Sequence, residues 1–139
     1  MRFWDSSALV PLLTPQSHTR HAVAWLQADP AIAAWALTPA EVTSALERLR
    51  REGLVSLAAV ADAEARMERF LRSAFIVEDI AEVQPTAQRL VRAHPLRAAD
   101  ALQLGAALVW VCHRFMRRLF LTFDQRLAEA ASGEGFTIL

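Results

Sequence analysis

Short apolar runs alternate along the chain with longer stretches in which apolar residues recur at helical spacing. The short runs are typical of buried strands, and they lie at 2–4, 31–37, 75–77, 118–121 and 136–139. Helical spacing predicts helices at about 18–28, from 38 up to Gly53, and at 56–72, 83–94, 98–114 and 124–132. Because strands alternate with helices, we expect residues 1–139 to form one three-layer α/β domain, with a five-stranded, mainly parallel sheet flanked by helices.

Two of these helices have distinctive sequences. The segment T38-P-A-E41 predicts a helix start with Thr38 as N-cap, a proline at the first helical position and Glu41 closing a capping box. The stretch 98–114 is apolar almost all round, which predicts a helix in the centre of the domain. The four tryptophans, Trp4, Trp25, Trp35 and Trp110, are expected in the core, with an interface as the alternative for Trp25 and Trp35.

The composition indicates a folded protein outside the membrane. Hydrophobic residues make up 54% of the 139 residues, which is ample for a core. The longest uncharged stretch near the middle of the chain, 101–112, is shorter than the roughly 20 apolar residues that cross a bilayer, and no signal-peptide pattern opens the chain. Cys112 is the single cysteine and lies among apolar residues, so we expect a buried thiol and a cytoplasmic location.

The charged residues exclude several classes of binding and catalytic site. Acidic and basic residues number 15 each, so the chain lacks the overall positive charge of a non-specific nucleic-acid binder. All the basic residues are arginine, which excludes a P-loop and a Schiff-base lysine. Two arginine groups could contact RNA phosphates, with solvated helix faces as the commoner alternative: Arg48, Arg50 and Arg51, and Arg114, Arg117 and Arg118.

Four carboxylates stand at helix starts. Each has an ordinary explanation as a helix cap or as a partner of a helix dipole, although Ser6 and Ser7 could cap the first helix without the acid before them. Carboxyl ends of parallel strands share one edge of a sheet, where ligands bind. Three of the acids follow predicted strands and the fourth could reach that edge from the central helix, so we expect convergence of Asp5, Glu41, Asp100 and Asp124.

Converging carboxylates repel one another. Two of them about 4 Å apart cost roughly 4 kcal/mol at an effective dielectric constant near 20, so a cluster requires protonation or a bound cation. Oxygen ligands suit Mg²⁺ or Mn²⁺ rather than Zn²⁺. Such a site is typical of metal-assisted phosphodiester hydrolysis. His18 and His21 are three residues apart and could share a metal, but with no third ligand nearby a solvated helix face is the better interpretation.

The motifs around these acids resemble a known family. The strand followed by D5-S-S-A-L, the helix start T38-P-A-E41, and the segments L96-R-A-A-D100-A-L-Q-L-G-A-A-L and L121-T-F-D124-Q-R-L-A-E-A-A together resemble the PIN domain, specifically the VapC-type toxin ribonucleases. The resemblance spans nearly the whole chain. It implies a five-stranded parallel sheet between helices, a Mg²⁺- or Mn²⁺-dependent endoribonuclease acting on RNA, and a small VapB-type antitoxin as partner. It also implies a homodimer that contacts DNA only through the antitoxin.

The resemblance also implies a role for each motif residue. Asp5 and Asp100 would be the principal metal ligands, Glu41 would bind the metal directly or through water, and Asp124 would complete the cluster. Ser6 and Thr122 would orient these acids or the water. Some members carry further acidic or asparagine residues near the last motif, whereas here T122-F-D124 offers a single acid for a second metal.

Two other functions are compatible with this pattern. One is a PIN-like module that retains the fold and acts mainly through a partner complex that regulates DNA. The other is a related metal-dependent DNA nuclease or phosphatase. The presence of all four acids favours an enzyme, since a module without catalysis should tolerate their loss.

Overall fold

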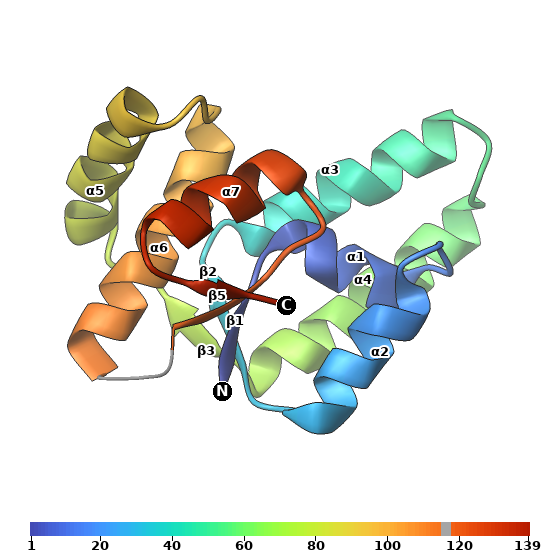
Figure 1. Cartoon of the computed structure of the whole chain (residues 1–139). Helices are drawn as coiled ribbons and strands as arrows, with labels where there is room; N and C mark the ends of the chain where they lie inside the picture. Colours follow the sequence, from blue (N-terminus) through green and yellow to red (C-terminus); the bar gives the residue numbers. More distant parts are fainter. Residues whose placement is uncertain (115–117) are drawn as a thin grey trace.

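The sheet is parallel throughout and lies between two groups of helices (Figure 1). The structure is a computed structural model that describes residues 1–114 and 118–139. Its strands, in the order β3-β2-β1-β4-β5, are β1 (Arg2–Trp4), β2 (Ile32–Trp35), β3 (Phe75–Val77), β4 (Leu119–Leu121) and β5 (Thr137–Ile138). The predicted α/β architecture and its five strands are confirmed in the described residues.

The helices follow the predicted spacing closely. They are α1 (Ser6–Leu13), α2 (Thr19–Ala28), α3 (Thr38–Arg51), α4 (Leu57–Arg72), α5 (Ile80–Ala93), α6 (Ala98–Arg114) and α7 (Gln125–Gly133). Helix α5 begins earlier than predicted because the Asp79 side chain caps it, accepting a 3.1 Å hydrogen bond from Glu82 N. Helix α1 continues through Pro11 and has no counterpart among the predicted ranges.

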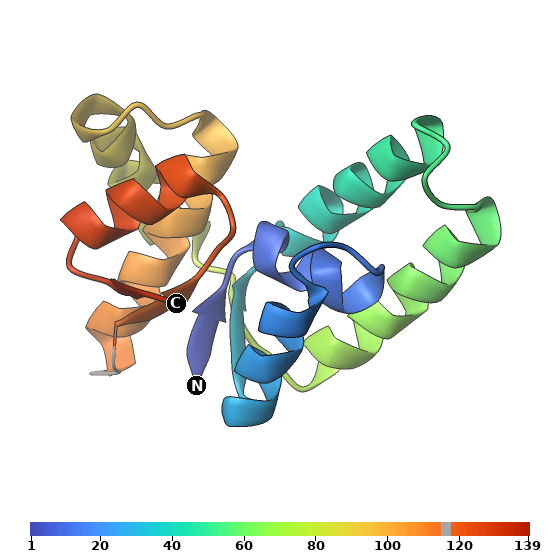
Figure 2. The same ribbon diagram turned by 45° about the vertical axis from the view of Figure 1, so that its right-hand side comes forward.

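The central strand β1 divides its side chains between two cores. In β1, Phe3 packs with α5, α6 and α7, whereas Trp4 packs with α1 to α4 on the other face. Figure 2 shows the two groups of helices on opposite sides of the sheet. Trp4, Trp35 and Trp110 are at most 1% exposed, which confirms them as core residues, while Trp25 is half-buried.

Two local predictions were wrong. Helix α3 is preceded by Leu37 at the N-cap, without a side-chain cap, and Thr38 is already helical. The Thr38 hydroxyl is fully buried and accepts a hydrogen bond of 3.3 Å from Gln103 in α6, so it is used between helices rather than as a cap. Cys112 is exposed, whereas the preceding residue Val111 is buried in the core, so the thiol lies on the side of α6 that faces away from the core.

The topology places the ends of three strands side by side. Strand β1 lies between β2 and β4, and all three run in the same direction. At the end of β1 the backbone N–H of Asp5 donates to the carbonyl of Leu121, the last residue of β4, at 3.0 Å. The sheet edge that carries the site is therefore held by main-chain bonding. None of the helices in the described ranges is both long and apolar enough to cross a lipid bilayer.

Candidate active site

The four predicted acids lie near one another at this sheet edge. Asp5 directly follows β1, and Asp124 follows β4 as the N-cap of α7. Glu41 and Asp100 lie in the first turns of α3 and α6. Burial raises the pKa of Glu41, and the charges of Asp5 and Asp100 raise it further. Burial likewise raises the pKa of Asp100, and Asp124 adds to the effect. These carboxylates therefore share one electrostatic environment.

Asp5 is the most enclosed of the four acids. Its residue is 3% exposed, and this burial raises the pKa of its carboxyl group. Hydrogen bonds to its oxygens oppose that rise: Ser7 donates through its hydroxyl and its backbone N–H, and Thr122 Oγ1 donates at 3.0 Å. Ser6 Oγ lies at 3.3 Å from Oδ1. Donors on both oxygens orient the carboxylate and favour its charged form.

Asp5 is also the N-cap of α1, since its side chain accepts the Ser7 N–H at 3.1 Å. The interpretation that Ser6 or Ser7 caps this helix, leaving Asp5 surplus to capping, was wrong. The N-cap position needs an extended backbone. Asp5 has that conformation, whereas Ser6 is already helical. The capping and the functional interpretations of Asp5 therefore apply to the same side chain.

Ser7 was missed as a site residue, although it joins two segments of the site. Its Oγ donates to Asp5 and accepts a 2.9 Å hydrogen bond from Phe123 N. It also lies 3.1 Å from Thr122 Oγ1. Thr122 Oγ1 in turn accepts from Asp124 N at 3.0 Å. The run D5-S-S signals a hydroxyl partner for the acid, but the sequence does not show which serine faces β4.

Gln103 is the second residue that sequence reasoning missed. It is 1% exposed in α6, and its Nε2 donates to Glu41 Oε2 at 2.6 Å. An ionised carboxylate can only accept, so the amide nitrogen must face Glu41. Gln103 follows Asp100 by three residues and so lies on the same side of the helix. A glutamine within the apolar segment 101–111 was the available signal.

A cavity of about 810 Å³ opens beside these residues. Glu41 and Asp100 line it, together with Ser6 and Ser7, which bond to the buried Asp5. Its other walls include two arginines and two aromatic residues: Arg48, Arg97, His18 and Phe123. The site thus combines carboxylates, guanidinium groups and ring surfaces in one opening.

The two arginine groups that were considered for RNA contact, with solvated helix faces as the commoner alternative, separate in the structure. Arg48 lines the cavity, whereas Arg50 pairs with Glu47 at 2.9 Å on the outer side of α3. Arg118 donates to the carbonyl of Glu134 at 3.0 Å. Arg117 and the side chain of Arg114 lie outside the described residues. Arg97, which the sequence interpretation did not place in either group, also lines the cavity and lowers the pKa of Asp100, against the rise that burial causes.

The donor set fits a hard divalent cation. It consists of carboxylate and hydroxyl oxygens, and burial raises the pKa values of three of the carboxyl groups, so a cation bound beside them would favour their charged forms. Within the described ranges, no three His, Cys, Asp or Glu side chains form a group that could hold a metal ion by themselves. This arrangement suits Mg²⁺, which retains several waters and is commonly held by one or two carboxylates.

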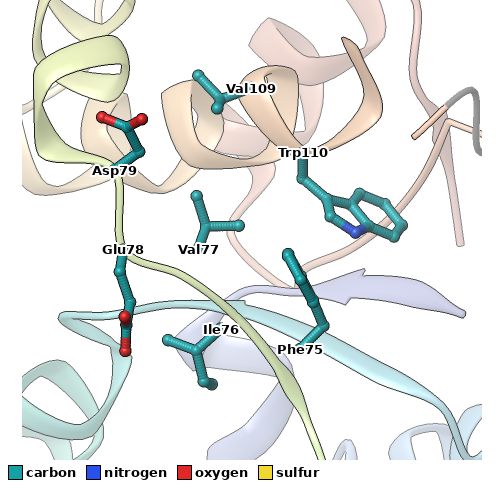
Figure 3. A pocket seen from close by; sticks show the side chains of 7 residues that line it. All are labelled: Phe75, Ile76, Val77, Glu78, Asp79, Val109 and Trp110. Atoms are coloured by element: carbon teal, nitrogen blue, oxygen red, sulfur yellow. The ribbon is translucent and has the colours of Figure 1, made fainter. Parts of the chain in front are cut away.

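A second pocket, of about 380 Å³, lies apart from these acids. Figure 3 shows its lining, in which Val109 and Trp110 of α6 face β3 and the acidic residues that follow it, Glu78 and Asp79. None of the four predicted acids lines it. The pocket at the sheet edge is therefore the one that carries the candidate chemistry.

Comparisons with known proteins identify the family of this chain. The family model of the PIN domain matches residues 2–133. The curated protein Ribonuclease VapC45 of Mycobacterium tuberculosis is 38% identical over 107 residues, which cover 76% of this chain and 74% of that protein.

Two solved structures share the fold. VapC20 of Mycobacterium tuberculosis, described as a Sarcin-Ricin loop cleaving toxin, superposes with a TM-score of 0.66 at 20% identity, covering 99% of this chain and 97% of that one. A toxin-antitoxin complex from Klebsiella pneumoniae gives a TM-score of 0.62 at 20% identity, covering 92% and 91%. At these identities the solved structures support the fold alone. The family model and the curated relative show in addition that the chain belongs to the PIN-domain family and is related to its VapC ribonucleases.

Proposed function

We propose that this protein is the ribonuclease toxin of a toxin-antitoxin pair and hydrolyses RNA phosphodiesters with Mg²⁺ or Mn²⁺. The observation that carries the proposal is the grouping of Asp5, Glu41 and Asp100 at one sheet edge, beside a cavity large enough for a nucleotide. The curated relative named a ribonuclease supports RNA as the substrate. Four carboxylates at such an edge match the needs of metal-assisted phosphoryl transfer.

In this proposal Asp5 and Asp100 hold the cation, and Glu41 and Asp124 bind it directly or through water. The cation supplies Lewis-acid polarisation of the phosphate and a water of lowered pKa. The chain itself orients Asp5 through Ser7 and Thr122, whose hydrogen bonds oppose the rise in the Asp5 pKa that burial causes. Ser6, 3.3 Å from Asp5, has a supporting part in that orientation.

Glu41 has a second capacity in the proposed reaction. Its pKa is raised, chiefly by burial, which brings the carboxylate closer to the range where it can take up and release a proton. Gln103 fixes Oε2 by its hydrogen bond of 2.6 Å, so the orientation of the carboxylate is set before substrate arrives. Glu41 is therefore suited to accept a proton from an attacking water.

The proposed partner is a small VapB-like antitoxin that covers the cavity and keeps the enzyme inactive. The fold shared with a chain of a toxin-antitoxin complex supports such a partner. We further propose a homodimer in the cytoplasm that meets DNA only through the antitoxin. Co-expression with a small DNA-binding protein encoded directly upstream should yield a complex in which RNA cleavage is suppressed.

A panel of substrates tests the proposed activity. Purified protein is incubated with RNA, with single-stranded DNA and with a simple phosphate ester, in Mg²⁺ or Mn²⁺ and in EDTA. We expect cleavage of RNA alone and only with the metal. The Asp100→Asn variant should lose the activity, and Asp62→Asn, an exposed acid of α4, should retain it. Cleavage of DNA or of the ester at the rate for RNA would contradict the proposal.

A further inference from the structure

A stack of aromatic rings leads from the core to the cavity. Trp25 in α2 and Phe123 after β4 are stacked, with centroids 4.7 Å apart and planes at 19°. The ring of His18 continues the stack on Phe123, at 4.3 Å and again at 19°. Trp4 supports the inner end through an edge contact with Trp25 at 6.2 Å. The two 19° pairs have the spacing of offset-stacked rings, and the Trp4–Trp25 pair has the geometry of an edge-to-face contact.

His18 forms the outer end of this stack. It is exposed, immediately precedes α2 and, with Phe123, lines the cavity that Glu41 and Asp100 also line. The interpretation of His18 as part of a merely solvated helix face was therefore incomplete. His21 is also exposed, but it does not line the cavity. The two histidines thus differ in position although they are three residues apart.

Hydrogen bonds connect the stack to the sheet edge that carries the candidate site. The backbone N–H of Phe123 donates to Ser7 Oγ at 2.9 Å, and Ser7 Oγ donates to Asp5. Phe123 also lies between Thr122, which bonds to Asp5, and the acid Asp124. Ring surface and carboxylates are consequently held in a fixed relation by the same loop.

The chemistry of the cavity fits an unpaired nucleotide. A ring surface binds any base by stacking, the guanidinium groups of Arg48 and Arg97 suit phosphates, and the carboxylates suit a cation on the scissile phosphate. A base within a duplex already stacks on its neighbours and cannot reach such a surface without being extruded. The cavity therefore favours single-stranded RNA over a duplex.

We propose that His18 and Phe123 form a stacking platform for an unpaired base of the RNA, adjacent to the phosphate that is cleaved. This platform deepens the proposed ribonuclease function and rests on it for the identity of the ligand. Because every base has a ring face, the platform selects for an unpaired nucleotide rather than for one particular base. The base extends the Trp25, Phe123 and His18 stack by one ring.

Binding of a fluorescent RNA tests the platform separately from cleavage. The probe is a short single-stranded oligouridine that carries one 2-aminopurine nucleotide, whose fluorescence is quenched by stacking. It is titrated with protein in the Asp100→Asn background, so that cleavage does not consume it. We expect quenching on binding. His18→Ala should weaken binding by about tenfold. His18→Tyr, which retains a ring, should restore it, and His21→Ala should bind as the parent does.

The cleavage reaction gives a second readout. In the otherwise unmodified protein, His18→Ala should raise KM for single-stranded RNA more than it lowers kcat, because the lost ring contributes to binding of the RNA rather than to the chemical step. Since His18 is exposed, the melting temperature of His18→Ala should stay close to that of the parent.

Several outcomes would overturn the platform. These are equal binding of the probe by His18→Ala and His21→Ala, failure of His18→Tyr to restore binding, or a loss of antitoxin affinity in His18→Ala with RNA binding intact. Quenching that depends on His18 in a protein that cleaves no RNA would retain the platform and remove the proposed function. Cleavage of RNA that does not depend on His18 would retain the proposed function and remove the platform.

Discussion

Gln103 Nε2 donates a 2.6 Å hydrogen bond to Glu41 Oε2 from a position that is 1% exposed. The other amide atom, Oε1, has no hydrogen-bond partner in the described part of the chain. A buried polar atom without a partner is unfavourable for folding, by about 1–3 kcal/mol. The glutamine is thus poorly explained as a stabilising core residue and well explained as a positioning residue for Glu41.

Replacing Gln103 by Met tests that assignment. Methionine has a similar length and no polar atom, so we expect the free energy of unfolding to stay within about 1 kcal/mol of the parent. Loss of the donor removes an effect that lowers the pKa of Glu41, so that pKa should rise further. The pH profile of RNA cleavage should then move to higher pH, with the loss of activity greatest on the acidic side of the profile. A profile that keeps its position would contradict the positioning role.

Asp124 and Asp79 form a matched pair of helix caps. Asp124 accepts from Leu127 N at 2.9 Å at the start of α7, and Asp79 does the same for α5. Asparagine also caps helices, so both Asp→Asn changes should alter stability by less than about 1 kcal/mol. RNA cleavage should fall about 10- to 100-fold for Asp124→Asn alone. Equal activities, measured alongside urea unfolding, would show that Asp124 is only a cap.

The five-stranded sheet, and the position of the four acids near one edge of it, could be predicted from the sequence for clear physical reasons. Short apolar runs and helical spacing are set by burial, so β1, β3 and α6 were located to the residue. The convergence of Asp5, Glu41 and Asp100 followed from the shared edge of parallel strands. These features depend on periodicity and topology, which a single sequence contains.

The missed features depend on which side chain faces which. The sequence does not show that Ser7 rather than Ser6 bonds to Phe123 N, or that Thr38 points to α6 instead of capping α3. The stack of His18 on Phe123 joins residues that are far apart in the chain. Such pairings depend on how loops pack in the folded protein, so they cannot be predicted from local patterns in the sequence.

Metal binding should stabilise the protein in a way that depends on Asp100. At a Mg²⁺ concentration 100 times Kd, binding adds about 2.7 kcal/mol, which is a rise of several degrees in Tm. Burial and the nearby Asp124 raise the pKa of the Asp100 carboxyl group, so its negative charge is unfavourable in the folded protein without metal. The Asp100→Asn variant removes that charge, and without metal its Tm should equal or exceed that of the parent. Its response to Mg²⁺ should be lost. The same rise in both proteins, measured by scanning calorimetry, would place the metal elsewhere.

An ion pair that does not line the cavity should make stability depend on pH. Arg89 donates to both oxygens of Glu134 at 3.0 and 2.8 Å, and His94 lies at 2.9 Å, which together join α5 to the end of α7. The Arg89 hydrogen bonds are the main cause of the lowering of the Glu134 pKa from 4.5 to about 2. The stabilisation is therefore complete above about pH 4.5 and is lost as the pH falls toward 2.

Glu134→Gln isolates this contribution. We expect the variant to be less stable than the parent by about 1 kcal/mol at neutral pH, because Arg89 is more than half exposed and the pair is screened by solvent. The difference should shrink as the pH falls from about 4.5 toward 2, since the parent's carboxylate becomes neutral first in the unfolded state and, near pH 2, also in the folded state. Urea unfolding at a series of pH values provides the measurement. A difference that is constant with pH would contradict the assignment.

The most direct test of a metal-dependent carboxylate site is RNA cleavage by Asp5→Asn. Asparagine retains the N-cap of α1 and the shape of the side chain, so the variant should fold, as checked by its melting temperature. We expect the parent to cleave RNA with Mn²⁺ and to stop in EDTA, and Asp5→Asn to lose activity by about a hundredfold or more. A folded Asp5→Asn variant that cleaves RNA at the parent's rate would contradict the central claim.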